Sequence, residues 1–312
     1  MTHRFGGARE RSMRRLRRML GNLFNAPATP QMLFPAGHFY SPIVDVDELR
    51  ARDGQVWPSE PSVLGIDFND PYHERVLREY FPAFYSDFAY PKKPDGDPLT
   101  FYLDNDQFSW LDCRALFVLL RAWRPKRFVE VGSGFSTLLV ADVNRRFLGG
   151  AMSITCVEPY PRPFLQSREL GITRLLVQKV QDVDTRIFSE LDAGDVLFID
   201  SSHVAKTGSD VNHLCFEVLP RLRQGVRVHF HDIFLPADYP KQWVLDENRS
   251  WNEQYVVRAL LMFSNAFRVL FGSSYAFAAH AVALREALRD PDGAYYGGGS
   301  LWIEKKIGRA HV

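Results

Sequence analysis

Acidic and imidazole side chains follow two apolar runs in the second half of the chain. Asp200 comes directly after the run DVLFI, and His231 and Asp232 come directly after the run VRVHF. If the two runs are neighbouring parallel strands, their carboxyl ends meet at one edge of a sheet, where α/β proteins bind their ligands. Carboxylates and an imidazole at one place bind a divalent cation, with Mg²⁺ or Mn²⁺ suited to the oxygen ligands. The same groups without a metal make a base that is oriented by an acid.

A glycine-rich turn forms a second candidate site. In the stretch RFVEVGSGFSTLLV, which spans 127–140, Gly132-Ser133-Gly134 joins an apolar strand pattern to a helical pattern that starts at Phe135. Glycines let the backbone adopt positive φ and let a ligand approach closely, and the helix start offers free N–H groups. Dinucleotides and S-adenosylmethionine both use such turns. Thr137 stands where the dinucleotide fingerprint requires its third glycine, and the stretch is no G-x-S-x-G hydrolase elbow.

An acidic residue at the end of the next strand along the chain could complete a nucleoside site. Glu158 follows the next apolar run, TCV, and lies 26 residues beyond Gly132. A carboxylate at the end of that strand can accept hydrogen bonds from both hydroxyls of a ribose. We therefore predict that Glu158 binds the same ligand as the glycine-rich turn.

The elements that position these residues alternate between strand and helix patterns from Trp110 onward. This alternation predicts an α/β fold with a doubly wound, mostly parallel sheet and helices on both faces. His229, two residues before His231, is expected to be a core histidine, and Asp210 a first-turn acid of its helix. Strands are predicted at 128–131, 153–157, 174–177, 195–199, 226–230, 267–271 and 300–303; helices are predicted at 111–122, from 135, at 162–170, at 210–222 and at 251–263, the last opened by a Ser250–Glu253 capping box.

Composition suggests a large globular protein with an unusual start. The chain has 312 residues, 46% of them hydrophobic, and a net charge of +1. Residues 1–20 contain seven arginines and one glutamate and so have a net charge of +6, which leaves a net charge of −5 for the rest of the chain. Leucines at helical spacing between these arginines predict either weak contact with an anionic membrane surface or a frayed basic tail. No nucleic acid partner is expected. No run of 18 apolar residues occurs, and three distant cysteines suggest buried thiols and a cytoplasmic protein.

Three regions are predicted: a basic tail (1–25), a proline- and aromatic-rich cap without sustained helical period (26–100), and the α/β domain (101–312).

A loop of about 16 residues after Asp232 is long enough to form a lid. The residues chosen as candidate substrate contacts are polar or aromatic and lie in the segment that precedes the α/β pattern or in this loop. They are Tyr102, Asn105, Tyr239 and Trp243.

Together, the motifs GHFYSP, EVGSGFST, DSSHVAKTGSD, HFHDIFLPADYP and WNEQY resemble bacterial class I S-adenosylmethionine-dependent methyltransferases associated with glycan and natural-product biosynthesis. The resemblance covers roughly residues 35–305. It implies the seven-strand Rossmann-like methyltransferase sheet and methyl transfer to a hydroxyl of a sugar, a glycan or a glycosylated small molecule. The cofactor residues that it implies are Glu130, Gly132, Ser133, Gly134, Ser136, Thr137, Glu158, Gln181 and Asp182.

The spacing of Asp200 and His203 is similar to that in metal-dependent catechol-type O-methyltransferases, which implies His203 as the base. The chain departs from that pattern because His231-Asp232 stands where Asp-Asn is expected. Two accounts follow for the candidate catalytic residues Asp200, His203 and His231. In one, Asp200, His231 and Asp232 bind a metal beside the base His203. In the other, no metal binds and His231 is the base.

Two other functions are compatible with the sequence. One is N-methylation of a small amine, which needs no metal. The other is a methyltransferase-like domain that binds a nucleoside without catalysis.

Overall fold

The computed structural model describes residues 33–289 and 297–307. Its contacts divide the chain into two units, Met1–Asp47 and Glu48–Val312. The described part of the first unit is a loop up to residue 45, in which the Gly37 N–H donates to the Ile43 carbonyl (3.1 Å) and Phe39 is exposed. The predicted basic tail lies outside the described residues, and the predicted regional boundaries at 25 and 100 stay predictions.

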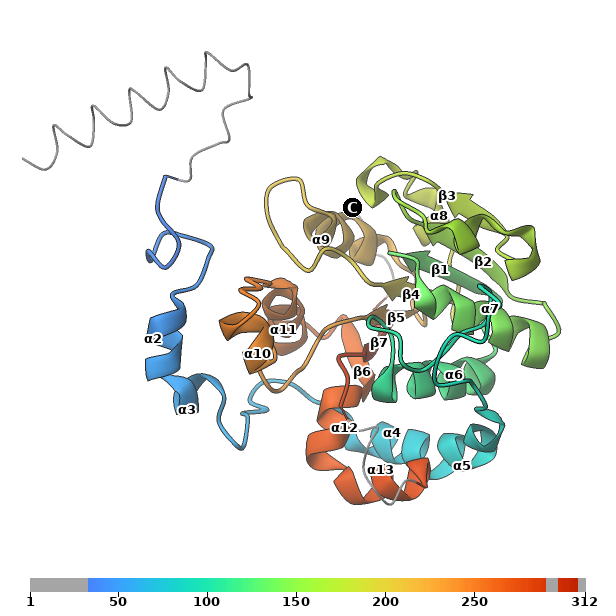
Figure 1. Ribbon diagram of the computed structural model, residues 1–312, viewed down its shortest axis with the longest axis horizontal. Coiled ribbons are helices and arrows are strands. Elements are labelled where there is room, and N and C mark those ends of the chain that lie inside the picture. The colour runs from blue at the N-terminus through green and yellow to red at the C-terminus, as the bar shows by residue number, and fades with distance from the viewer. Residues whose placement is uncertain (1–32, 290–296, 308–312) are drawn as a thin grey trace, which may run out of the picture. The chain divides into compact units, whose positions relative to one another are not determined.

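A seven-stranded sheet forms the centre of the second unit (Figure 1). Its order is β3-β2-β1-β4-β5-β7-β6, and every neighbouring pair is parallel except those that involve β7. The predicted doubly wound α/β fold is therefore confirmed. The strands are β1 (Arg127–Val131), β2 (Ser153–Val157), β3 (Arg174–Leu176), β4 (Val196–Ile199), β5 (Arg227–Phe230), β6 (Phe267–Gly272) and β7 (Leu301–Lys305).

Strand register brings the candidate residues to one edge. The last residue of β1, Val131, pairs with both Val157 of β2 and Ile199 of β4, and Ile199 pairs with Phe230 of β5. The residues that follow these strand ends are Gly132, Glu158, Asp200 and His231, so the sheet places them side by side.

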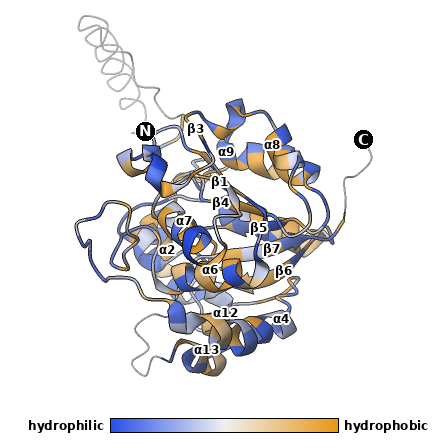
Figure 2. Ribbon diagram, turned by 90° about the vertical axis from the view of Figure 1, so that its right-hand side faces the viewer, coloured by the Kyte–Doolittle hydropathy of each residue, from blue (hydrophilic) through white to orange (hydrophobic). Residues whose placement is uncertain are grey.

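Helices cover both faces of the sheet because its strands are apolar on both sides. Phe128 and Phe198 face the cluster that contains α6 and α7, whereas Val129 and Leu197 face the cluster that contains α8 and α11. Hydrophobic and hydrophilic residues are mixed along the surrounding helices (Figure 2). The α-helices are α2 (Val46–Ala51), α3 (Asp53–Val56), α4 (Asp70–Arg75), α5 (Phe81–Phe84), α6 (Trp110–Trp123), α7 (Phe135–Phe147), α8 (Arg186–Ser189), α9 (Asp210–His213), α10 (Lys241–Leu245), α11 (Glu253–Phe263), α12 (Ser273–Ala279) and α13 (Ala281–Leu288).

Shorter turns extend or replace some of these helices. Two π-helical turns continue α4 and α9, and the remaining turns are of the 3₁₀ type. No described helix has the length and apolarity that crossing a bilayer requires. The turns are η1 (Val76–Tyr80), η2 (Tyr85–Asp87), η3 (Pro163–Gln166), η4 (Arg168–Leu170), η5 (Val180–Asp182), η6 (Leu214–Val218) and η7 (Leu219–Arg221).

Three local predictions were wrong. The helix predicted at 162–170 is two 3₁₀ turns, because Ser167 between them is extended and its hydroxyl caps the second turn. The cap segment has helices from Asp70 to Asp87, with Pro71 and Pro82 in first turns obscuring the period. No capping box opens α11, because the His203 carbonyl accepts its first N–H groups and the Glu253 carboxylate bonds elsewhere.

Candidate active site

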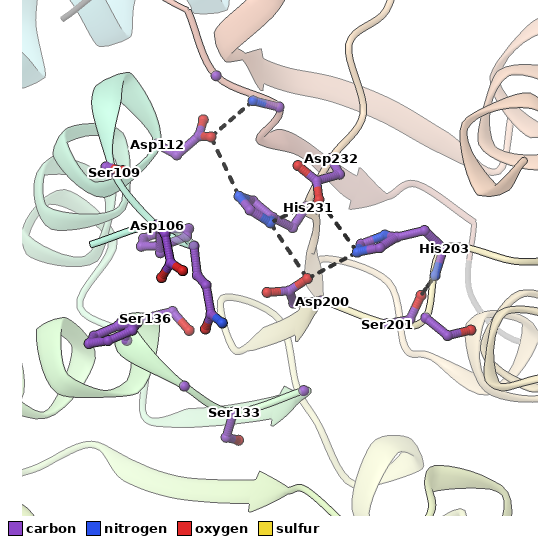
Figure 3. Close-up of a pocket in the computed structure, with 18 of the residues that line it drawn as sticks. Asp106, Ser109, Asp112, Ser133, Ser136, Asp200, Ser201, His203, His231 and Asp232 are labelled. Atoms are coloured by element: carbon purple, nitrogen blue, oxygen red, sulfur yellow. Dashed lines mark hydrogen bonds and ion pairs between the residues drawn. The ribbon is translucent and has the colours of Figure 1, made fainter. Parts of the chain in front are cut away.

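A cavity of about 1000 Å³ opens at the carboxyl edge of β1, β2, β4 and β5. The glycine-rich turn, the loops after β4 and β5 and the segment before α6 contribute to its wall (Figure 3), and residues of α10 and the loop after it also line it. This edge is where the strand order changes direction, which is the usual ligand site of open α/β sheets. The residues that line the cavity include Asp106, Gln107, Trp110, Asp112, Gly132, Ser133, Gly134, Ser136, Glu158, Asp200, His203, His231, Asp232, Phe234, Trp243, Arg249, Trp251 and Gly297–Gly299.

The glycine-rich turn touches the loop after β4. Gly132 has φ +82°, and a Cβ built on it would lie 1.8 Å from the backbone oxygen of Asp200. Gly134 has more space, since a Cβ there would lie 3.7 Å from Gln107 Oε1. The Ser133 hydroxyl is buried and has no hydrogen-bond partner among the described residues. A buried hydroxyl without a partner beside an open cavity suits a polar ligand.

Glu130 and Thr137 support this turn from behind and do not line the cavity. The hydroxyls of Ser136 and Thr137 donate to the two carboxylate oxygens of Glu130, and Thr137 Oγ1 accepts from the Gly134 N–H (3.1 Å). Burial raises the pKa of Glu130 to about 7, against the lowering effect of the two hydroxyls. The structure therefore places both predicted cofactor residues where they shape the turn, not where they contact a ligand.

The remaining predicted cofactor residues separate into two groups. Glu158 lines the cavity, and one of its oxygens accepts the Tyr160 N–H (2.8 Å). Gln181 and Asp182 lie outside the residues that line it. The Gln181 side chain donates to the Gly208 carbonyl (3.0 Å), and Asp182 is exposed in turn η5.

Two carboxylates and two imidazoles form a closed ring in the cavity, which we call the acid–histidine ring (Asp200, His203, His231 and Asp232; Figure 3). His203 Nε2 lies 3.4 Å from both Asp200 Oδ1 and Asp232 Oδ2. His231 Nδ1 lies 3.5 Å and 3.7 Å from the same two oxygens. One ligand atom from each of Asp200, His231 and Asp232 lies within 4.8 Å of the other two, so these three can contact one cation. His203 and Asp232 have φ of +61° and +56°, strained conformations typical of functional sites.

Two further acids hold the imidazoles from outside the ring. His203 Nδ1 is hydrogen-bonded to Glu253 Oε2 (3.0 Å), and Ser201 donates to the other oxygen of Glu253 (2.9 Å). His231 Nε2 lies 3.5 Å from Asp112 Oδ2. Asp112 and Glu253 are both buried. Sequence reasoning missed both, because Asp112 lies within a hydrophobic helix pattern and Glu253 stood at a capping-box position.

These acids control the charge of the ring. Burial alone would lower the pKa of His203, but its contacts with Asp200 and Glu253 outweigh burial and raise it to about 10. Burial also lowers the pKa of His231, but the charges of Asp232 and Asp200 outweigh burial and raise this pKa well above its ordinary value. Burial raises the pKa of Asp232, while the two imidazoles bring that of Asp200 well below its ordinary range. A protonated imidazole cannot accept a proton, so a histidine of the ring acts as a base only after its own proton has left.

Three of the four predicted substrate residues, Tyr102, Asn105 and Tyr239, are not among the residues that line the cavity. Tyr102 packs edge-on against Phe135, and the Asn105 side chain bonds to the backbone of its own loop. Tyr239 is buried, and its hydroxyl accepts the Gln254 N–H (3.0 Å). Trp243 of α10 does line the cavity.

Two expectations for neighbouring residues are confirmed. His229 is buried, stacks on Phe198 with ring centroids 3.8 Å apart, and bonds to the Ser300 hydroxyl (2.8 Å). Asp210 occupies the first turn of α9, where it also accepts hydrogen bonds from the Ser202 hydroxyl and N–H.

Comparison with known proteins identifies the family. A family described as "Methyltransferase domain" matches residues 129–233. An uncharacterized protein from Archaeoglobus fulgidus is 38% identical over 165 residues, which are 51% of this chain and 74% of that protein. The chain belongs to the methyltransferase domain family.

Solved structures of methyltransferases are also similar at lower identity. An SAH-bound methyltransferase from Podospora anserina is 16% identical with a TM-score of 0.39; the match covers 89% of this chain and all of that one. An SAH-complexed O-methyltransferase from Bacillus cereus is 15% identical with a TM-score of 0.37, covering 84% of this chain and all of that one.

The methyltransferase domain match runs from β1 to the residue after Asp232. It therefore includes the glycine-rich turn, Glu158 and all four members of the acid–histidine ring. Asp112 and Glu253, which hold the two histidines, lie on opposite sides of the match, on α6 and α11.

Proposed function

We propose that this methyltransferase uses S-adenosylmethionine to methylate a hydroxyl group of a sugar, a glycan or a glycosylated small molecule. The observation that carries the proposal is the shared cavity. Its lining includes the glycine-rich turn with Glu158 and the acid–histidine ring, and Gly132 joins the two through its contact with Asp200. A methyl donor at the turn and an acceptor at the ring would therefore meet in one space.

The turn and Glu158 supply the groups that a nucleoside methyl donor needs. In this proposal Glu158, which lines the cavity, accepts hydrogen bonds from the ribose hydroxyls. The Ser133 hydroxyl, which lacks a protein partner among the described residues, supports a polar ligand at the turn. Gly134 leaves room for the methionine part of the donor. Gln181 and Asp182, which do not line the cavity, are weaker candidates for contact with the adenine.

The acid–histidine ring supplies the chemistry at the acceptor. The hydroxyl oxygen attacks the methyl carbon in line with the carbon–sulfur bond; a carbon–oxygen bond forms, the carbon–sulfur bond breaks, and the hydroxyl proton leaves to a base. Holding the three atoms in line provides much of the acceleration. The ring receives the proton, either with Mg²⁺ or Mn²⁺ bound between Asp200, His231 and Asp232 or without a metal.

Aromatic side chains support a sugar as the acceptor. Trp110, Phe234, Trp243 and Trp251 line the cavity. Large flat rings bury the apolar faces of a bound ligand while the surrounding polar groups fix its orientation. Arg249 lies over Trp243, with its guanidinium carbon 4.1 Å from the ring centroid, which adds a cation beside these rings.

The test is in two stages. Calorimetric titration with S-adenosylmethionine and S-adenosylhomocysteine should give one binding site per chain in wild-type protein, with weaker binding in Gly134→Val. Transfer of radiolabelled methyl groups should then be measured on panels of hydroxyl and amine acceptors. Transfer to amines alone would establish N-methylation instead, and cofactor binding without any transfer would support a non-catalytic nucleoside-binding domain.

A further inference from the structure

A guanidinium is fixed in the wall of the cavity, in the loop that follows α10. Arg249 lies over two indole rings, with its guanidinium carbon 4.1 Å from the centroid of Trp243 and 4.8 Å from that of Trp251. Arg249 Nη2 forms an ion pair with Glu247 Oε2 (2.5 Å), and the Arg249 N–H donates to the Trp243 carbonyl (2.9 Å). Stacking, the ion pair and the backbone bond together hold this cation in one place.

The ion pair with Glu247 uses only part of the guanidinium. Arginine has five N–H donors in a planar fork. Glu247 is the one carboxylate within 4.0 Å of the Arg249 guanidinium among the described residues, and it does not line the cavity. The Arg249 side chain is still 34% exposed. Glu247 therefore anchors the cation, and the donors that remain can bind an oxyanion that enters the cavity.

The surroundings of Arg249 connect it with the acid–histidine ring. The ring centroid of Trp251 lies 4.3 Å from that of His203, and Arg249 lies over the same indole. A group bound at Arg249 is therefore close to the acid–histidine ring. Arg162, which also lines the cavity, lies over Phe135 (4.9 Å), the residue that directly follows the glycine-rich turn. The contacts thus associate Arg249 with the ring and Arg162 with the turn.

The charges around the cavity favour an oxyanion with a single negative charge at Arg249. Two arginines and no lysine are among the described residues that line it, whereas five of these residues are acids. A single guanidinium among so many carboxylates can offset one negative charge, but a phosphate brings between one and a half and two. The planar fork of arginine also matches the two oxygens of a carboxylate. The position therefore suits a carboxylate better than a phosphate.

We infer that Arg249 binds a carboxylate of the methyl acceptor, so that this methyltransferase acts on a hydroxyl of an acidic sugar of the uronic acid class. The inference rests on the proposed function, since it names the kind of sugar whose hydroxyl is methylated. A carboxylate fixed at Arg249 orients the sugar relative to the acid–histidine ring and so decides which hydroxyl meets the donor. The carboxylate itself is not methylated, and the product is a methyl ether.

Matched pairs of sugars test the inference. Methyl glucuronide and methyl glucoside differ only in a carboxylate that replaces a hydroxymethyl group, and methyl galacturonide and methyl galactoside form a second such pair. Each sugar, and the corresponding sugar phosphates, is titrated by calorimetry into full-length protein with S-adenosylhomocysteine present. Wild type should bind the acidic member of at least one pair roughly 10- to 150-fold more tightly than the neutral member, and more tightly than the phosphate.

Variants of Arg249 separate carboxylate binding from a structural role. Arg249→Gln should reduce the preference to about twofold or less, and Arg249→Lys, which keeps the charge without the planar fork, should give an intermediate preference. If Arg249 only supported the two indoles, its loss would weaken both members of a pair equally and leave the preference unchanged. Circular dichroism confirms folding, and Arg249→Lys decides the matter if Arg249→Gln does not fold.

Arg75→Gln is the matched control. Arg75 also pairs with a glutamate, Glu79 (3.2 Å), and lies over an aromatic ring, that of Tyr80 (5.3 Å). It belongs to α4 and does not line the cavity. Arg75→Gln should therefore keep the wild-type preference for the acidic sugar.

The inference is overturned if no acidic sugar binds more tightly than its neutral partner, if the phosphates bind best, or if Arg249→Gln keeps the preference. A transferred methyl group that mild base releases as methanol would also overturn it, because that product is an ester of the carboxylate. Cofactor binding and methyl transfer to neutral hydroxyls, without a preference for acidic sugars, reject this inference alone. A preference for acidic sugars without any cofactor binding rejects the proposed function and leaves Arg249 as a carboxylate-binding residue.

Discussion

Gly132 and Asp200 touch so closely that no other residue type fits at position 132. A Cβ on Gly132 would lie 1.8 Å from the Asp200 backbone oxygen, and φ at Gly132 is +82°. The Asp200 N–H also donates to the Val131 carbonyl (2.9 Å), so the two chain segments are bonded as well as in contact. The backbone segments that directly follow β1 and β4 therefore hold the proposed donor site and the acid–histidine ring next to each other.

Replacement of Gly132 should therefore damage the fold, whereas replacement of Gly134 should not. Gly132→Ala meets both a steric overlap and an unfavourable φ, and we expect it to lose about 3 kcal/mol or more of unfolding free energy. Gly134→Ala is the matched control, since its Cβ would be in ordinary contact with Gln107. Urea denaturation measures both. Equal stability of the two variants would contradict this account of the turn.

Glu158 should contribute to cofactor affinity without contributing to the fold. A hydrogen bond to a charged group is worth about 1.5–3 kcal/mol, so Glu158→Ala should weaken binding of S-adenosylhomocysteine roughly 10- to 150-fold. Glu169→Ala, at an exposed acid on the nearby turn η4, should leave the affinity unchanged. Calorimetric titration provides the comparison. Unaltered affinity in folded Glu158→Ala would remove Glu158 from the cofactor site.

The sequence predicted the sheet edge well because strand patterns and strand ends are local features. Apolar runs located all seven strands, and the parallel order then brought Gly132, Glu158, Asp200 and His231 together. The helix at 162–170 was wrong because the conformation of Ser167 depends on a local cap that the apolar pattern does not encode.

The supporting acids could not be predicted for a different reason. Asp112 reaches His231 from 119 positions away in the chain, and Glu253 reaches His203 from 50 positions away. Each contact depends on how a helix packs against the sheet, and nothing in the neighbouring residues records that packing. Glu130 shows the opposite case, since its position in the motif was correctly noticed but its side chain points into the core instead of the cavity.

Glu130 should make stability depend on pH. Its pKa is raised by burial from 4.5 to about 7 in the folded protein, so folding favours its protonated form. The resulting stabilisation is full below about pH 4.5 and is lost as the pH rises through about 7; a shift of this size corresponds to about 3 kcal/mol.

Glu130→Gln removes this titration and keeps a hydrogen-bonding side chain. Urea denaturation at pH 5, 6.5 and 8 should show the wild type losing stability relative to the variant as the pH rises. Glu169→Gln, at the exposed acid used above, should parallel the wild type. A constant difference between wild type and Glu130→Gln across this range would show that Glu130 does not titrate there.

Trp243 should bind the acceptor and not the cofactor. It lies on α10 within the loop after β5, and its ring packs edge-on against Phe234 and Trp251, at centroid distances of 5.3 and 5.4 Å. Removing a ring that buries a ligand face loses about 1.5–3 kcal/mol, so Trp243→Ala should raise the KM for the acceptor found in the panel roughly 10- to 150-fold.

The affinity of Trp243→Ala for S-adenosylhomocysteine should stay within about twofold of wild type, since our proposal assigns cofactor binding to the glycine-rich turn and Glu158 and not to Trp243. Phe263→Ala, at an aromatic residue that is 85% exposed at the end of α11, controls for the loss of a large apolar side chain. Steady-state kinetics and calorimetry measure the two constants separately. Weaker cofactor binding with an unchanged acceptor KM would reverse the assignment, because Trp243 would then contact the methyl donor and not the acceptor.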